Sequence, residues 1–292
     1  MASPGRRHHG LDAQRRRELR RQWLAAGAVS LLALVALGGL YLRQRLVPPL
    51  RGPFPARPLN DIPISFDPSA VPGALRVLRT GKPYRTGKCS ALYRGHCVET
   101  IVLERYVQGV VSGEEGVFHR AIHIPELAGG AHLSESQRRR RVAEAWKLQA
   151  VAARSYALYA VLADKYRVKK TGFHITDTPW DQVYTDRRSE LVDAAVGATR
   201  GQVLVDRRGR LLHALYSASC GGRGTRSVLK ASDRIECHPD CGRHEYRRSS
   251  HYVGMCQWGS LLFAMEGHDL GRLVGRYYPG ARLQKVTYKG SR

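Results

Sequence analysis

The sequence predicts an α+β fold: one mixed, β-rich folded domain with a long Ala-rich helix, preceded by a transmembrane helix and a Pro-rich stalk. Three observations lead to this prediction: β-patterned segments between residues 74 and 111, an alanine-rich stretch at 142–164, and an uncharged apolar run near the N-terminus. Strands and helices alternate without a repeating βαβ order, which favours α+β over α/β. The expected boundaries are a cytoplasmic Arg-rich tail at 1–22, a transmembrane helix at 23–42, a linker at 43–73 and the folded domain at 74–292.

The apolar run WLAAGAVSLLALVALGGLYL, residues 23–42, has the length of a membrane-spanning helix. Twenty residues at about 1.5 Å each match a hydrocarbon layer of about 30 Å. Arginines are concentrated before this run, which predicts that the N-terminus stays in the cytoplasm and the remainder lies outside it. The alternative is a cleaved signal peptide, but the run is longer than a usual signal core and lacks a clear A-x-A site.

Eight of the fourteen prolines fall between Pro48 and Pro72. Proline at this density disfavours helices and central strands, so we expect an extended, semi-rigid stalk.

The charge and the cysteines restrict the environment of the folded domain. The formal net charge of +24 predicts an anionic partner, and nucleic acid, anionic lipid and acidic wall polymer all fit. Outside the cytoplasm, six cysteines favour disulfides, and Cys89 with Cys97 is the local pair that we expect, joining a predicted hairpin. The alternative is a zinc site in ECHPDCGRH, with Cys237, His238, Cys241 and His244 as ligands. Our prediction is the disulfide interpretation, with no metal and no cofactor.

Within the folded domain, ALRVL and CVETIVLERYVQGVV predict strands between residues 74 and 111. The stretch 142–164 contains no Gly or Pro and predicts a helix. Ser134 and Gln137 could form a capping box that starts this helix earlier, with a break near 138–141. Further along, we expect a hairpin at 201–219 that turns at 206–209, an irregular region at 220–250 and a final strand at 285–289.

Four segments, in order along the folded domain, resemble the SpoIID/LytB family of cell-wall proteins. They are VVSGEEG at 110–116, WKLQAVAARSYAL at 146–158, DQVY at 181–184 and HYVGMCQWGS at 251–260. The resemblance implies that 74–292 is a catalytic domain, a lytic transglycosylase that cuts peptidoglycan glycan strands, preferably those without stem peptides. Some members carry a Cys/His zinc cluster before the third motif, and this chain has no cysteine there.

In this family one glutamate of the first motif is essential, and it falls on Glu114. Glu115 and Gly116 stand where the family usually has Met and Pro, and about twenty extra residues precede Trp146. A lytic transglycosylase can work with one carboxyl group, which protonates the glycosidic oxygen and then removes a proton from the muramoyl 6-hydroxyl. We therefore expect Glu114 to be the catalytic acid, with its pKa raised by burial. Glu115 as the acid, or two ordinary turn carboxylates, are the alternatives.

The remaining motif residues supply the groups that line glycan grooves, namely amides, aromatic rings and hydrogen-bonding side chains. We expect Arg154 to form structural hydrogen bonds, although it is included among the candidates. Cys256 is interpreted as half of a disulfide, with Cys220 as a partner. The predicted substrate-binding residues are Lys147, Gln149, Arg154, Gln182, Tyr184, His251, Gln257 and Trp258.

The predicted protein is a single-pass lytic transglycosylase of the bacterial cytoplasmic membrane, with its catalytic domain outside the cytoplasm. Its expected partners are peptidoglycan glycan strands, the membrane through residues 23–42 and a cell-wall amidase, and not nucleic acid. A LytB-like protein that binds glycan and enhances an amidase without cutting is the main alternative. A basic protein that binds anionic polymer, and a Cys/His hydrolase, are the others.

Overall fold

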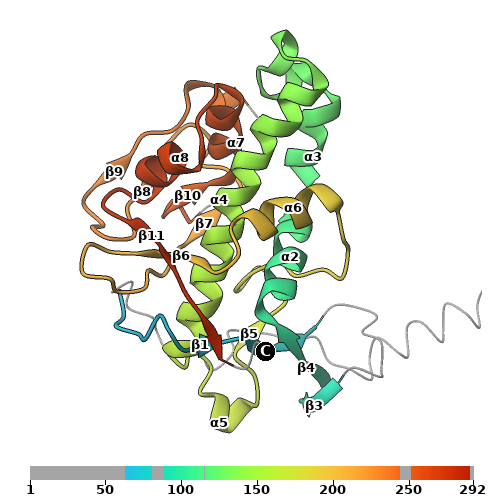
Figure 1. Cartoon of the computed structure of the whole chain (residues 1–292), viewed down its shortest axis with the longest axis vertical. Helices are drawn as coiled ribbons and strands as arrows, with labels where there is room; N and C mark the ends of the chain where they lie inside the picture. The colour runs from blue at the N-terminus through green and yellow to red at the C-terminus, as the bar shows by residue number, and fades with distance from the viewer. Residues whose placement is uncertain (1–62, 81–88, 115, 244–250, 290–292) are drawn as a thin grey trace, which may run out of the picture. The chain divides into compact units, whose positions relative to one another are not determined.

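Helix α4 (Glu135–Leu162) is the central element and runs along the long axis of the domain (Figure 1). It begins at the predicted capping box, in which the Ser134 hydroxyl accepts from the backbone N–H of Gln137, and the Gln137 side chain accepts from that of Ser134. The predicted break near 138–141 was wrong. Arg138 is buried and donates to the carbonyls of Ile122 and Leu133, so tertiary contacts hold the arginine run in the helix.

The computed structural model describes residues 63–80, 89–114, 116–243 and 251–289. These residues all belong to one unit, Pro53–Arg292. The predicted tail (1–22), the predicted membrane span (23–42) and most of the predicted linker lie outside the described residues.

A four-stranded sheet forms one end of the described domain, with strand order β3-β4-β2-β5 (Figure 1). Strands β2 and β4 are antiparallel, and β5 is parallel to β2. These pairings confirm the strands predicted from ALRVL and from the first part of CVETIVLERYVQGVV. The strands are β2 (Ala74–Arg79), β3 (Cys89–Tyr93), β4 (His96–Val102) and β5 (Ile175–Thr176).

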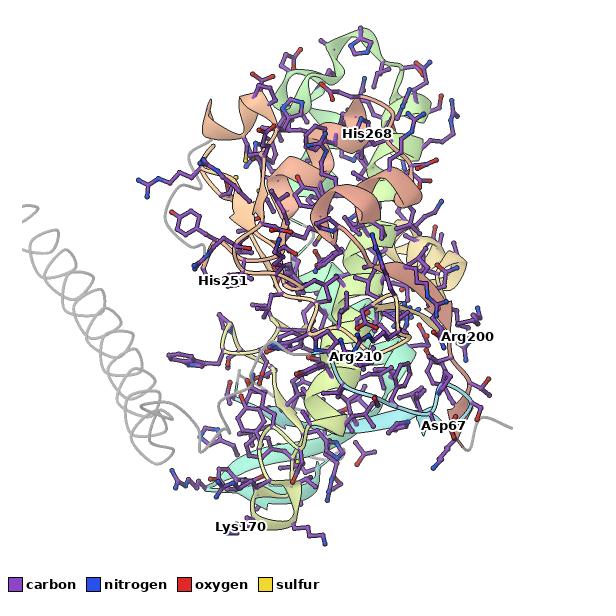
Figure 2. All side chains as sticks on the ribbon, turned by 90° about the vertical axis from the view of Figure 1, so that its left-hand side faces the viewer. Asp67, Lys170, Arg200, Arg210, His251 and His268 are labelled. Carbon is purple, nitrogen blue, oxygen red and sulfur yellow. A yellow bond between two sulfur atoms is a disulfide. The ribbon has the colours of Figure 1, made fainter. Side chains whose placement is uncertain are left out.

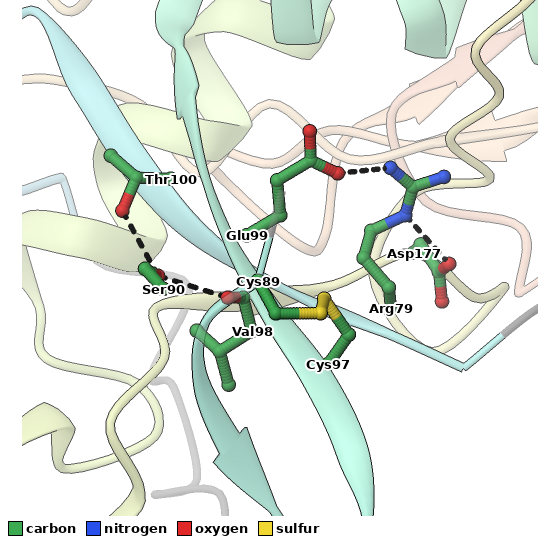
Figure 3. Close-up of a disulfide and its surroundings, with 8 residues drawn as sticks. All are labelled: Arg79, Cys89, Ser90, Cys97, Val98, Glu99, Thr100 and Asp177. Atoms are coloured by element: carbon green, nitrogen blue, oxygen red, sulfur yellow. Dashed lines mark hydrogen bonds and ion pairs between the residues drawn. A yellow bond between two sulfur atoms is a disulfide. The ribbon is translucent and has the colours of Figure 1, made fainter. Parts of the chain in front are cut away.

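The predicted Cys89–Cys97 disulfide is confirmed and joins β3 to β4 (Figure 3). Beside it, the Arg79 guanidinium pairs with Glu99 at 2.6 Å and with Asp177 at 3.3 Å. This ion cluster ties β2 and β4 to the segment that leads into the DQVY motif.

The second part of CVETIVLERYVQGVV is helix α2 (Leu103–Glu114), and its prediction as a strand was wrong. Leu103, Tyr106, Val107, Val110 and Val111 are all buried, at the i, i+3, i+4, i+7, i+8 spacing of a helix face. Val and Tyr favour strands as isolated residues, but this spacing buries all five against the core only in a helix.

Helices α2, α3 and α6 pack on one side of α4, and α7 and α8 pack on the other (Figure 1). The buried alanines of α4 allow these close approaches. The remaining helices are α3 (Gly116–His123), α5 (Val168–Thr171), α6 (Glu190–Ala198), α7 (Gln257–Met265) and α8 (Leu270–Tyr277), with short 3-10 helices η2 (Pro125–Ala128), η3 (Gly130–His132) and η4 (Pro239–Arg243).

The remaining strands form two-stranded pairs: β1–β12, β7–β10, β6–β11 and β8–β9. The predicted turn at 206–209 is present, because the Gly209 N–H donates to the Asp206 carbonyl. Its second arm meets β6 in one isolated bridge, Val205 with Leu211, and the Leu212 N–H donates to the Leu204 carbonyl. The predicted final strand is divided in two. The strands are β1 (Val71–Pro72), β6 (Gln202–Val205), β7 (Tyr216–Ser217), β8 (Thr225–Arg226), β9 (Arg234–Ile235), β10 (Met255–Cys256), β11 (Arg282–Lys285) and β12 (Tyr288–Lys289).

The fold prediction therefore needs two corrections. The α+β class holds, but helices and not strands make up most of the regular structure, because 103–114 is helical and α4 is unbroken. Among the described residues no helix is both long and apolar enough to cross a membrane, since even α4 carries charged residues along its length. The described residues thus form an α+β domain, and residues 23–42, where the membrane helix was predicted, lie outside them.

One buried ion pair connects α4 to α2. The Arg154 guanidinium donates to both carboxylate oxygens of Glu104, at 3.0 and 2.8 Å, and also to the Gln202 carbonyl at 3.0 Å. Burial opposes the charged form of Glu104, but the hydrogen bond and the charge of Arg154 outweigh it and hold the pKa of Glu104 below its usual value.

Candidate active site

Glu114, the last residue of α2, lines a cavity of about 350 Å³. The other walls come from α4, the segment 179–183, β7 with the residues beside it, and the segment that leads into α7. The polar and aromatic residues that line it include Tyr156, Trp180, Asp181, Tyr216, His251 and Gln257.

Two glycines of α2 allow the DQVY segment to cross the helix beside Glu114. A Cβ on Gly113 would lie 2.6 Å from the Val183 carbonyl oxygen, and a Cβ on Gly109 would lie 2.2 Å from the Tyr184 ring. The Thr185 N–H donates to the Gly109 carbonyl at 3.2 Å. Gly109 and Gly113 are one helical turn apart and lie on the same face of α2. Together they form a strip of backbone without side chains, the glycine track, that the DQVY segment contacts.

Asp181 fixes the other side of this segment. Its fully buried carboxylate accepts hydrogen bonds from the Tyr156 hydroxyl at 2.9 Å, the Tyr166 hydroxyl at 2.8 Å, and the backbone N–H and hydroxyl of Thr176, each at 2.8 Å. It also forms an ion pair with Lys165. Because these groups occupy the carboxylate, Asp181 is a structural anion of the cavity wall.

Two amide side chains position the Glu114 carboxyl group. Gln257 Nε2 lies 3.1 Å from Glu114 Oε2 and 3.2 Å from Gln149 Oε1, so one amide group donates to both. Burial raises the pKa of Glu114, while the hydrogen bonds from Gln257 and from the backbone of Val183 oppose this effect. The net effect favours the protonated acid, as the sequence predicts.

Tyr216 and His251 form a second group in the cavity wall. Gln182 is almost fully buried and donates to the Tyr216 hydroxyl at 2.9 Å, so it supports this ring from behind. His251, marked in Figure 2, has Nε2 3.0 Å from the Tyr216 carbonyl, and its Nδ1 accepts from the Val253 N–H. These contacts place the proton on Nε2.

Six of the eight predicted substrate-binding residues are not among those that line the cavity, and two of them, Gln149 and Gln182, contact lining residues. Lys147 pairs with Glu144, and Arg154 is buried against Glu104. Tyr184 stacks on Tyr106 at 5.4 Å between ring centroids, and Trp258 is buried in the core. Glu115, the alternative acid, lies outside the described residues.

Three aromatic residues that line the cavity were not among the predicted site residues: Tyr156, which lies within the second motif, Trp180 and Tyr216. Trp180 lines the cavity with 62% of its surface exposed, and Tyr216 lines it from β7. Trp180 directly precedes DQVY, so an aromatic residue beside a motif could have identified it. Tyr216 had no such signal, because it reaches the cavity through the pairing of β7 with β10.

A cavity with a buried carboxyl group of raised pKa, an amide donor and aromatic walls is the kind of site that binds sugars. Residues 133–205 match the family model of SpoIID, described as stage II sporulation protein. This match confirms the predicted SpoIID recognition and covers α4, DQVY and β6. An uncharacterized protein of Brachyspira hyodysenteriae is 38% identical over 81 residues, which cover 27% of this chain and 21% of that protein. The chain thus spans about a fifth of that relative's length.

Proposed function

We propose that this protein is a peptidoglycan lytic transglycosylase in which Glu114 is the single general acid and base. The observation that carries the proposal is the Glu114 carboxyl group itself. It lines a cavity, burial raises its pKa, and Gln257 holds one oxygen while the other is not engaged by that amide. A general acid at neutral pH needs such a raised pKa.

The proposed reaction begins when the Glu114 carboxyl proton moves to the glycosidic oxygen between N-acetylmuramic acid and N-acetylglucosamine. The bond from C1 to that oxygen breaks, and the N-acetylglucosamine part leaves with a hydroxyl group. The Glu114 carboxylate then takes the proton of the muramoyl 6-hydroxyl, and O6 bonds to C1. The product is a 1,6-anhydro end, no water is consumed, and Glu114 is protonated again.

The surroundings of Asp181 support a mechanism with one carboxyl group. Hydrolytic glycosidases use two carboxyl groups, one as acid and one as nucleophile or base. Asp181 also lines the cavity, but its carboxylate is occupied by the hydrogen bonds of Tyr156, Tyr166 and Thr176. An internal hydroxyl of the substrate, in place of a second carboxylate, then completes the reaction.

The predicted binding residues take two roles in this proposal. His251 and Gln257, together with Trp180 and Tyr216, contact the sugars, because they line the cavity. The others hold these groups in place, through Gln149 on Gln257 and Gln182 on Tyr216, or support the surrounding helices. Those that support from a distance are Lys147, Arg154, Tyr184 and Trp258.

The test is mass spectrometry of peptide-free glycan strands after incubation with the full chain, with Glu114→Gln and with Glu190→Gln. Glu190 is an exposed carboxyl residue of α6 and serves as the matched control. We expect anhydro-muramoyl ends from the wild type and the control, and a rate lower by about 10²- to 10⁴-fold for Glu114→Gln.

Two outcomes would contradict the proposal. Reducing ends in place of anhydro ends would mean that water is the nucleophile. A folded wild type that binds glycan but produces no cut would favour a LytB-like enhancer of an amidase, and the departures at Glu115 and Gly116 from the family pattern are the observation behind that second candidate.

A further inference from the structure

Four cysteine sulfurs converge beside the first turn of α7, outside the cavity of Glu114. The Sγ atoms of Cys220, Cys237, Cys241 and Cys256 all lie within 4.8 Å of one another. They come from four separate places: the segment after β7, the segment after β9, the 3-10 helix η4, and β10. Three of the four residues are buried, and Cys237 is half-buried.

We propose that these four cysteines bind one Zn²⁺ ion as a closed structural site. Tetrahedral zinc with Zn–S bonds of about 2.3 Å separates its sulfurs by about 3.8 Å. The Cys241 sulfur lies 3.5 Å from those of both Cys220 and Cys256, close to that edge length. Cys237 and Cys241 also have the short ligand spacing that structural zinc sites use, with three residues between them.

The four sulfurs are not arranged as two disulfide bonds. The sulfurs of Cys220 and Cys237 are 2.7 Å apart, whereas the bonded Cys89 and Cys97 sulfurs are 2.07 Å apart. Every sulfur of the cluster has three sulfur neighbours, as in a four-ligand metal site, and not one partner. The predicted Cys220–Cys256 disulfide was wrong, because both cysteines are free in the structure. In this proposal they share one metal ion.

The surroundings of the sulfurs suit metal-bound thiolates. The backbone N–H groups of Cys220 and Gly259 each lie 3.3 Å from Cys256 Sγ, and the Ser219 hydroxyl lies 3.7 Å from Cys241 Sγ. Such donors stabilise the negative charge of a coordinating sulfur. A Cβ on Gly259 would lie 3.4 and 3.5 Å from the sulfurs of Cys256 and Cys237, so the backbone of α7 packs directly against the cluster.

The histidines of the zinc site considered from the sequence do not take part. His238 Nε2 lies 2.9 Å from the Glu266 carboxylate, and its Nδ1 accepts from the Asp240 N–H, so both ring nitrogens are engaged away from the sulfurs. His244 lies outside the described residues. The ligand set is thus four cysteines, and zinc favours such a set.

The cluster is connected to the candidate active site through one peptide unit. Cys256 caps α7 by accepting from the Gly259 N–H, and the next residue is Gln257, which holds Glu114. Zinc would therefore fix the start of α7 and the position of this amide. The expected effect of zinc on cleavage rests on the proposed function, whereas the expected zinc content of the protein does not.

The experiment measures zinc by elemental mass spectrometry in the full chain, purified without strong chelators and dialysed against a weak one. We expect about one zinc per chain, released when a mercurial reagent titrates the thiols. Replacement by Co²⁺ should give the absorption of tetrahedral cobalt bound to thiolates. Cys241→Ser should lose the metal, and the matched control Cys89→Ser/Cys97→Ser should retain it.

A second measurement keeps the proposal testable if Cys241→Ser does not fold. The wild type is denatured with chelator, alkylated without reductant and weighed as an intact chain. Four alkylated cysteines support the proposal. No alkylated cysteine, with no zinc in the native protein, would mean two further disulfides and would overturn it, as would iron in place of zinc. Loss of zinc from the disulfide control would also contradict it.

Discussion

Glu104 and Glu114 lie near opposite ends of α2, and their surroundings move their pKa values in opposite directions. Burial disfavours the charged form of both groups. Glu104 faces the guanidinium of Arg154, which outweighs burial, whereas Glu114 faces a neutral amide, which does not. The helix therefore carries one carboxyl group whose pKa is lowered by an ion pair and one whose pKa is raised by burial.

The raised pKa of Glu114 makes a prediction about stability. The folded state holds the proton of Glu114 at pH values where the unfolded chain, with an ordinary pKa of 4.5, has lost it. The contribution of this group is thus complete below pH 4.5 and decreases as the pH rises through the raised pKa. Glu114→Gln, which cannot ionise, should be more stable than the wild type at pH 7 and about equal to it at pH 4.

Urea denaturation at a series of pH values measures this difference, and each unit of pKa corresponds to about 1.4 kcal/mol. Glu190→Gln should follow the wild type at every pH. If Glu114→Gln were less stable than the wild type at pH 7, burial would not be the dominant influence on the pKa of the Glu114 carboxyl group.

At the scale of single residues, the sequence predicted which side chains lie together where they belong to a recognised motif. The SpoIID-like motifs pointed to Glu114, Gln149 and Gln257, which the structure brings together, although their roles remain proposals. Trp258, the neighbour of Gln257 in the same motif, lies in the core. A motif gives the residue type and position, but whether a side chain faces a cavity depends on packing that local sequence does not contain.

At the scale of elements, α2 shows why residue preference alone misled the sequence analysis. Its valines and Tyr106 favour a strand, and the chain enters it directly from β4. The helical spacing of the buried residues was already present in the sequence, together with Gly109 and Gly113, which are four residues apart. These glycines are a further helical signal, because they place the bare backbone on the face that DQVY crosses.

We expect replacement of glycine by alanine to have opposite effects on stability at Gly113, in the glycine track, and at Gly197, outside it. Gly113→Ala would place a Cβ 2.6 Å from the Val183 carbonyl oxygen and should destabilise the fold by about 1–3 kcal/mol, because the segment must move. Gly197→Ala, in α6, meets no atom within 4 Å and should stabilise by about 0.4–1 kcal/mol.

Chemical denaturation gives both values. Gly113→Ala should also lower the cleavage rate, because Val183 borders Glu114, whereas Gly197→Ala should leave it unchanged. Equal changes in the free energy of unfolding for Gly113→Ala and Gly197→Ala would show that the DQVY segment moves without cost. That result would contradict a tight contact between this segment and the glycine track.

At the scale of the whole molecule, distant parts of the chain meet at the pair of Arg154 and Glu104. The guanidinium also donates to the carbonyl of Gln202 in β6. The carboxylate accepts from the Gly201 N–H and from the hydroxyl of Tyr288 in β12. Two helices and two strands are therefore joined at one buried charge pair, and its loss should weaken the entire domain.

We expect Arg154→Met to lower the free energy of unfolding by about 3–5 kcal/mol, because it leaves Glu104 buried without its counter-charge. Arg139→Met, in the same helix, removes an exposed pair with Glu135 and should cost less than about 1 kcal/mol. Urea denaturation of the two variants provides the comparison. A loss for Arg154→Met as small as that of the control would mean that the pair does not join these elements.

The long-range pairings could not be predicted from the sequence. Strands β1, β7, β10 and β12 have two residues each, too few to show an alternating pattern. They pair only because the helices around α4 bring their segments together. The long helix, the strands of the hairpin and its disulfide are local features, and these were predicted.

The contact between Gln257 and Glu114 joins residues 143 positions apart in the chain. The contact therefore exists only when segments from both halves of the chain are folded against each other. A nascent or partly degraded chain then carries the carboxyl group without the amide that positions it. The proposed lytic activity would therefore begin only with the complete fold and end with the first disruption of it, which confines cutting of the wall to intact molecules.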